Sequence, residues 1–245
     1  LVHARLAWRW TTKQVNMHAH SGSPGANSCC HPSLMNFKVI FGLLVATNTL
    51  FAAPAVQAQS GALMDAVEVN NAVNVVEELN IALANLMLSD ETDSEARKAL
   101  IGPALRKAFD LTAMTRAIVG GRTWRGAEES EQTAAAQAFS DWMVSQYATR
   151  FTRSSNPKFS TRETRDGGID TIIVETVLRT SKRAVNLDYR LRQSDGAFKI
   201  IDVYLDGRVS EVALRKSEYR KLIKSEGLAG FTAAMQEKAA LATRS

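Results

Sequence analysis

The sequence predicts an α+β fold in which helices come first, a four-stranded antiparallel sheet follows, and helices close the chain. Three observations lead to this prediction. Apolar residues recur at spacings of three and four from about 66 to 151. They alternate with polar residues between about 159 and 205, and the helical spacing then returns. Separate runs of helix and strand are typical of α+β proteins. We expect a twisted sheet with helices across one face, enclosing an apolar cavity.

The first two helices are predicted from spacing and from end signals. Residues 92–95 (Thr-Asp-Ser-Glu) resemble a capping box, and they predict a second helix that reaches about 109 with Pro103 as its weak point. The first helix, about 66–88, is predicted from one apolar stripe: Val69, Val73, Val76, Leu79, Leu83 and Leu86.

Two more helices are predicted before the sheet. Asp110 can cap a short third helix over 111–119, which Gly120 and Gly121 end. Glutamates at 128, 129 and 131 favour the start of a fourth and longest helix that reaches about 151. Its large apolar side chains share one side: Ala135, Phe139, Trp142, Met143, Tyr147 and Phe151.

Turn residues divide the alternating region into strands. Asp-Gly-Gly at 166–168, Thr-Ser-Lys at 180–182 and Ser-Asp-Gly at 194–196 suit antiparallel hairpins. Two closing helices are predicted over about 209–225 and 228–240, separated by Gly227. The four predicted strands are 159–165, 171–179, 183–192 and 198–205.

The beginning of the chain has the layout of a secretory signal peptide. Met35 is followed by one Lys, a short apolar run and a small-x-small site that ends at Ala58. The run is shorter than the ~20 residues that span a bilayer, although an uncleaved anchor is the alternative. We therefore expect 1–34 to be an upstream or targeting extension, 35–58 a signal peptide cleaved near Ala58, and 59–245 a single exported domain.

Removal of that segment excludes several classes of chemistry. All four His and both Cys lie within the first 31 residues. The remainder therefore has no Cys nucleophile, disulfide, His-ligated metal or Ser-His-Asp triad, and we expect no cofactor and no metal site. It carries 26 basic and 25 acidic residues, a net charge of +1, so the basic composition gives no argument for nucleic-acid binding.

One run of the chain contains Phe109, Asp110, Met114, Gly120 and Trp124, and it is followed in order by 189–192, Asp195-Gly196, 198–203 and Asp206-Gly207. Together these segments resemble the MlaC family, also called the toluene-tolerance family, over roughly 69–239. The run from Arg208 to Tyr219 and the pair Gly227-Leu228 are more similar to HpnM, the hopanoid-associated branch. The resemblance implies a periplasmic location.

The resemblance implies a carrier of phospholipid or hopanoid. It also implies partners: an inner-membrane lipid transport complex and an outer-membrane lipoprotein or porin complex. A carrier needs apolar walls, because each buried methylene stabilises by about 0.8 kcal/mol and a sixteen-carbon chain resists leaving a bilayer by roughly 12 kcal/mol. Arg122 and Arg125, beside Trp124, are candidates for a phosphate head group. The candidate wall residues are Phe139, Trp142, Met143, Tyr147, Phe151, Ile173, Val177, Tyr189, Phe198, Val203, Leu205, Leu214, Tyr219 and Leu222.

Two other functions are compatible with the sequence. One is a small cone-shaped α+β enzyme that uses carboxylates, with Asp188 and Asp202 as the candidate pair. A two-residue turn at Asp195-Gly196 would place Tyr189 opposite Asp202, so the two aspartates would point to opposite sides of the sheet. The other is an interaction protein that bridges envelope complexes without cargo.

Overall fold

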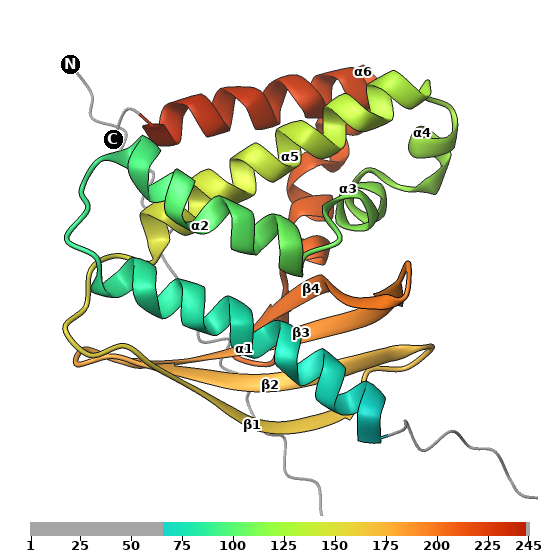
Figure 1. The fold of residues 1–245 in the computed structure, drawn as a ribbon. Coiled ribbons are helices and arrows are strands. Elements are labelled where there is room, and N and C mark those ends of the chain that lie inside the picture. Colours follow the sequence, from blue (N-terminus) through green and yellow to red (C-terminus); the bar gives the residue numbers. More distant parts are fainter. Residues whose placement is uncertain (1–65, 244–245) are drawn as a thin grey trace, which may run out of the picture. The chain divides into compact units, whose positions relative to one another are not determined.

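A computed structural model describes residues 66–243. The predicted extension and signal peptide lie outside these residues. The α+β prediction is confirmed: helices lie on one face of an antiparallel meander with strand order β1-β2-β3-β4-β5 (Figure 1). The elements are α1 (Ala66–Leu88), α2 (Ser94–Ala108), α3 (Leu111–Val119), α4 (Gly121–Arg125), α5 (Glu129–Arg150), β1 (Lys158–Asp166), β2 (Thr171–Arg179), β3 (Ala184–Ser194), β4 (Ala197–Leu205), β5 (Val209–Ser210) and α6 (Glu211–Thr243).

The helix ends follow the predicted chemistry with one correction. Asp110 caps α3, since its side chain accepts a hydrogen bond from the Ala113 amide at 2.8 Å. The cap of α2 is Asp93, which accepts from the Ala96 amide, and not Thr92. A carboxylate accepts more strongly than a hydroxyl, so Asp93 prevails. Pro103 lies inside α2 without ending it.

One buried arginine joins the ends of two helices to α2. Arg97 of α2 is 9% exposed, and it donates to the backbone oxygens of Leu86, Glu91, Ala148 and Phe151 at 2.7–3.4 Å. These carbonyls belong to the end of α1, the loop after it and the end of α5. The five donors of a guanidinium suit such a cluster of orphan carbonyls.

The sheet differs from the prediction in one strand and in one register. Asp195 and Gly196 both have positive φ, as a tight hairpin requires, and Ser194 pairs with Ala197. Beyond this turn a bulge shifts the ladder, so Asp202 pairs with Arg190 and not with Tyr189. Residues 209–210 form a fifth strand, β5, where the sequence predicts the start of a helix.

The last helix contains the predicted break. Gly227 has φ 65° and ψ −150°, which interrupts α6 between Glu211 and Thr243. Only glycine adopts this conformation readily. The two halves of α6 therefore pack at an angle, and Tyr219 of the first half meets Phe231 of the second edge-to-face at 5.5 Å.

Candidate functional site

A row of four aromatic rings runs from the core to the beginning of the sheet. Phe109 packs edge-to-face on Tyr147 at 6.0 Å, Tyr147 stacks on Phe151 at 5.3 Å, and Phe151 stacks on Phe159 at 6.5 Å. Tyr147 and Phe151 lie four residues apart at the end of α5, so they share one side of that helix. Phe109 is buried, whereas the other three rings are half-buried. The row therefore presents partly accessible apolar surface.

A second aromatic group lies deeper, where α5 meets α6. Phe139 is 5.5 Å from Trp142 and 6.5 Å from Phe231, and all three are buried. The guanidinium of Arg215 lies 4.9 Å from the centroid of the Trp142 ring. A cation over a ring face is stabilised by the ring quadrupole. This group thus combines apolar packing with a buried positive charge.

The sheet contributes apolar side chains to the core that the helices cover. Tyr189 pairs with Val203, and Leu187 pairs with Leu205, on the helix-facing side. All four side chains belong to the single hydrophobic core. The sequence places them there because β3 alternates apolar and polar residues, and the bulge in β4 restores the alternation after Ile200.

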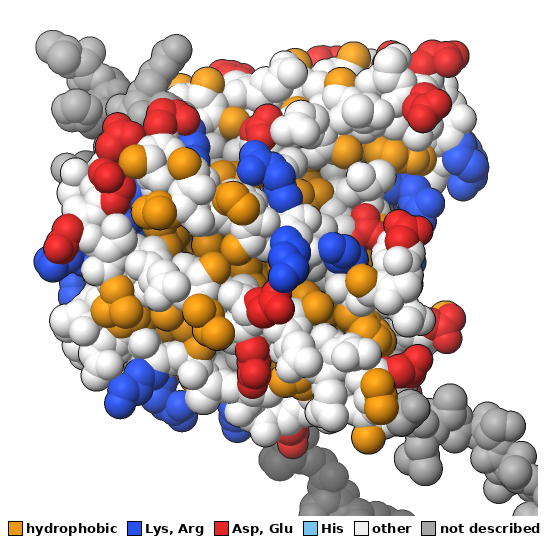
Figure 2. Space-filling model, in the orientation of Figure 1, with side chains coloured by type: hydrophobic (Ala, Val, Ile, Leu, Met, Phe, Trp, Pro, Cys, Tyr) orange, Lys and Arg blue, Asp and Glu red, His pale blue; other side chains and the backbone are white. Residues whose placement is uncertain are grey.

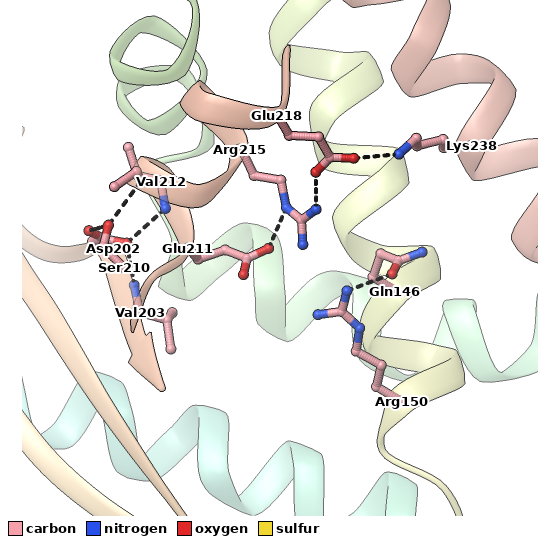
Figure 3. Close-up of polar contacts among 11 residues, drawn as sticks. Gln146, Arg150, Asp202, Val203, Ser210, Glu211, Val212, Arg215, Glu218 and Lys238 are labelled. Atoms are coloured by element: carbon pink, nitrogen blue, oxygen red, sulfur yellow. Dashed lines mark hydrogen bonds and ion pairs between the residues drawn. The ribbon is translucent and has the colours of Figure 1, made fainter. Parts of the chain in front are cut away.

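A charged cluster lies beside the second aromatic group (Figure 3). Arg215, whose side chain is 4% exposed, donates to Glu211 at 2.7 Å and to Glu218, which also accepts from Lys238 at 2.8 Å. Arg150 of α5 donates to Gln146 at 2.8 Å. A charge as buried as that of Arg215 needs partners, because desolvation disfavours an isolated ion. We call Arg150, Glu211, Arg215, Glu218 and Lys238 the inner charge cluster.

Burial shifts the pKa of several groups at this site. Burial raises the pKa of both Tyr147 and Tyr189, so the two hydroxyls stay neutral at ordinary pH. Burial lowers the pKa of Arg150, which the charge of Glu211 partly offsets. Within 66–243 there is no group of His, Cys, Asp or Glu that could hold a metal ion. Both tyrosine rings pack in or against the hydrophobic core.

The structure brings most of the predicted wall residues to the helix-facing side of the sheet. Tyr147, Phe151 and Leu222 are half-buried against the core, and Leu214 is half-buried on α6. Their contact with a lipid stays a prediction. The residues buried within the core are Phe139, Trp142, Met143, Tyr189, Phe198, Val203, Leu205 and Tyr219.

Two of the predicted wall residues lie elsewhere. Ile173 pairs with Arg190 and Val177 pairs with Asn186, on the face opposite the helices. Their neighbours Ile172, Val174 and Leu178 supply the core instead. Five of the nine residues of β2 are apolar and they fall on both faces of the strand, so alternation alone did not reveal which face is inside.

The shifted register also corrects the geometry of the two aspartates. Asp202 pairs with Arg190, so Asp188 and Asp202 belong to the same face and not to opposite ones. They still form no acid–base pair. Burial raises the pKa of Asp202, but its carboxylate accepts hydrogen bonds from Ser210, Val203 and Val212 at the start of α6 (Figure 3). Burial and then Glu175 raise the pKa of Asp188.

The predicted head-group residues lie on a helix that the sequence did not predict. Arg122 and Arg125 belong to the short helix α4, and both side chains are exposed. Trp124 between them is buried in the core. No contact in the described residues joins either arginine to the aromatic row, and their role as head-group ligands stays a prediction.

Sequence reasoning missed the inner charge cluster and Phe159. One signal for the cluster was available, because Glu211, Arg215 and Glu218 have the spacing of helical neighbours. Their burial was not visible, since charged residues at such spacing usually lie on a solvated face. Phe159 was assigned to a strand, but its contact with Phe151 crosses the loop between α5 and β1.

A hollow of about 310 Å³ lies between α1, α2 and the start of β4. Leu79, Ala108 and Phe198 give it apolar walls, and Glu78 and Lys107 form an ion pair at 2.6 Å beside it. This volume is at the lower limit of small-molecule pockets. Of the predicted wall residues, Phe198 lines it.

Comparison with known proteins agrees with this geometry. The family model described as MlaC protein matches residues 74–237, about two thirds of the chain. The chain belongs to the MlaC family. A solved structure of the phospholipid-binding protein from Ralstonia solanacearum, in complex with a phospholipid, superposes with a TM-score of 0.61 at 18% identity. The match covers 71% of this chain and 98% of that one, and it shows a shared fold. A search of curated proteins finds no match.

Proposed function

We propose that this MlaC family member is a lipid carrier that holds the apolar part of a lipid against the inner wall of α5, α6 and the sheet. Family membership supports a binding protein, and the observation that carries the proposal is the half-buried aromatic row. Partly accessible rings at Tyr147, Phe151 and Phe159 are the surface that a hydrocarbon chain would cover.

The strength of lipid binding follows from the apolar area that the lipid and the protein bury against each other. A carrier must offset roughly 12 kcal/mol for each sixteen-carbon chain that leaves a bilayer, at about 0.8 kcal/mol per methylene. Aromatic side chains bury about 150–250 Å² each, so a few of them supply a large part of the required contact. A wall of this kind needs no reacting group, which agrees with the absence of His and Cys after residue 31.

The cargo we propose is a phospholipid. The solved relative is described as phospholipid-binding, which supports this class. A hopanoid remains the alternative that similarity to the HpnM branch raises. We further propose that the carrier works in the periplasm, between an inner-membrane transport complex and an outer-membrane complex. No helix within 66–243 is both long and apolar enough to cross a bilayer.

Native mass spectrometry of protein purified from periplasm tests the proposal. We expect a mass increment that lipid extraction identifies as phospholipid. Tyr147→Ala and Phe151→Ala should lower the lipid-bound fraction, because each removes ring surface from the row. Leu100→Ala is the matched control, since Leu100 is a 55% exposed apolar residue of α2 that is not a member of the row. Lipid-free wild-type protein would contradict a carrier and favour a bridging protein. Equal retention in all variants would show that the aromatic row is not the surface that holds the lipid.

A further inference from the structure

A basic groove lies on the surface between α3, α4, β4 and the beginning of α6. Its volume is about 650 Å³. Four cationic side chains line it, each from a different element: Arg116 of α3, Arg125 of α4, Arg192 of β3 and Lys216 of α6. Trp124 and Ile201 are also part of its lining. Figure 2 shows Lys and Arg side chains at the edge of the molecule beside α4.

The positive charge of the groove is largely uncompensated. No Asp or Glu is among its lining residues within the described part of the chain. Arg116, Arg125 and Lys216 form no side-chain hydrogen bond or ion pair with any residue of 66–243. The nearest carboxylate contact is between Asp110 and Arg192 at 3.9 Å, and Asp110 is already engaged as the cap of α3. Four converging cations create a potential that attracts an anion.

One of the cations lies beside a glycine. A Cβ at Gly121 would lie 2.9 Å from Nη1 of Arg125, closer than side chains tolerate. The guanidinium of Arg125 therefore lies next to Gly121 at the wall of the groove. Trp124, 8% exposed, and the half-buried Ile201 add apolar surface beside the charges. Basic walls with apolar surface fit a chain segment that carries both acidic and apolar side chains.

The geometry favours a protein segment over a bilayer. A flat membrane surface contacts cations that protrude, whereas these cations line a depression into which a partner must insert. The groove lies near the buried Phe109 end of the aromatic row, since Phe109 pairs with Ile200, but it is remote from the Phe159 end. Arg192 lies near the β3–β4 turn, and Val185, seven residues away, lies next to the Phe159 end of the sheet, about 23 Å away at ~3.3 Å per residue. A partner seated here would leave the Phe159 end of the row uncovered.

We propose that the groove is a docking site for an acidic, partly apolar segment of a partner protein. The probe is a fluorescein-labelled octapeptide that alternates Glu with Leu, with a Gln-for-Glu peptide as the neutral reference. At about 50 mM NaCl we expect the acidic peptide to bind and to shift the Trp124 indole resonance, and binding should weaken at higher salt. The double variant Arg116→Glu/Arg125→Glu should weaken binding about tenfold or more.

The matched control is Arg122→Glu/Arg220→Glu. Both arginines are exposed outside the groove, and the double variant changes the net charge by the same amount. It should alter affinity less than about twofold. Equal weakening by both double variants would overturn the proposal, because net charge alone would then explain binding. So would binding of phosphatidylglycerol vesicles, lost in the groove variant, without binding of the peptide. Circular dichroism verifies the fold of each variant.

Discussion

Arg215 of α6 lies over the ring of Trp142 of α5, with its guanidinium carbon 4.9 Å from the ring centroid. The same guanidinium donates to Glu211 and Glu218 on either side along its own helix. One side chain thus fixes the first half of α6 against α5, next to the surface proposed to hold lipid.

Arg215→Met should destabilise the protein strongly. The change keeps much of the side-chain length but leaves Glu211, 13% exposed, without its buried partner. Removal of one member of such a pair costs about 3–5 kcal/mol when fully buried, and we expect about 2–4 kcal/mol here. Urea unfolding measures this loss of unfolding free energy, and Lys216→Met, at an exposed site, is the control. Adding Glu211→Gln should recover at least ~1 kcal/mol, and purely additive effects would argue against the ion pair.

Glu218 gives the inner charge cluster a pH dependence. Burial raises the pKa of Glu218, but the hydrogen bond from Lys238 and the charge of Arg215 outweigh it, so the pKa lies below its ordinary 4.5. The stabilisation is therefore present above pH 4.5 and is lost as the pH falls through the lowered pKa. Glu218→Gln should cost about 0.5–1 kcal/mol at pH 7, since the side chain is 36% exposed. The difference from wild type should vanish near pH 3.

That pH series needs a control at a carboxylate outside the cluster. Glu226→Gln changes an exposed residue of α6 and should leave the unfolding free energy within about 0.5 kcal/mol at both pH values. A loss for Glu218→Gln that persists unchanged at low pH would show that its charge is not responsible.

Arg97→Lys tests the hydrogen bonds from Arg97 to the ends of α1 and α5. Lysine keeps the charge but lacks the planar fork, so several of the four carbonyls would lose their donor. We expect a loss of about 2–3 kcal/mol in unfolding free energy. Hydrogen exchange of the Ser154 amide, which donates to Met87, should also accelerate. Arg220→Lys, at an exposed site, should have no effect on either measurement.

Gly227→Ala tests the break in α6. No atom lies within 4 Å of a Cβ built there, so any cost comes from the backbone alone. With φ at 65° and ψ at −150° we expect a destabilisation of about 1–3 kcal/mol by thermal or urea unfolding. Gly126→Ala is the reference, because its φ of −86° suits any residue. Equal stabilities for the two variants would contradict a break in the helix at Gly227.

The sequence predicted the helical and strand regions well where a single period dominated. The α1 stripe, the Asp110 cap and the Asp195-Gly196 turn are local signals, and each has the expected place. Prediction from the sequence failed where two patterns compete. Residues 209–210 have apolar and polar residues that suit either helix or strand, and pairing with β4 decided for β5. The short helix α4 was missed because five residues give no period.

Some properties of this protein follow from the chain alone: the α+β order, the confinement of His and Cys to the first 31 residues, and the aromatic side of α5. Each depends on neighbours within a few residues, which a linear pattern displays. Tertiary structure decided which face of β2 is inside and where Asp202 points, because the bulge after Ile200 and the cover of helices set both. It also decided that Arg215 is buried and that four distant cations share one groove. Such placements depend on contacts between residues far apart in the sequence, and the periodicity of the sequence does not show these contacts.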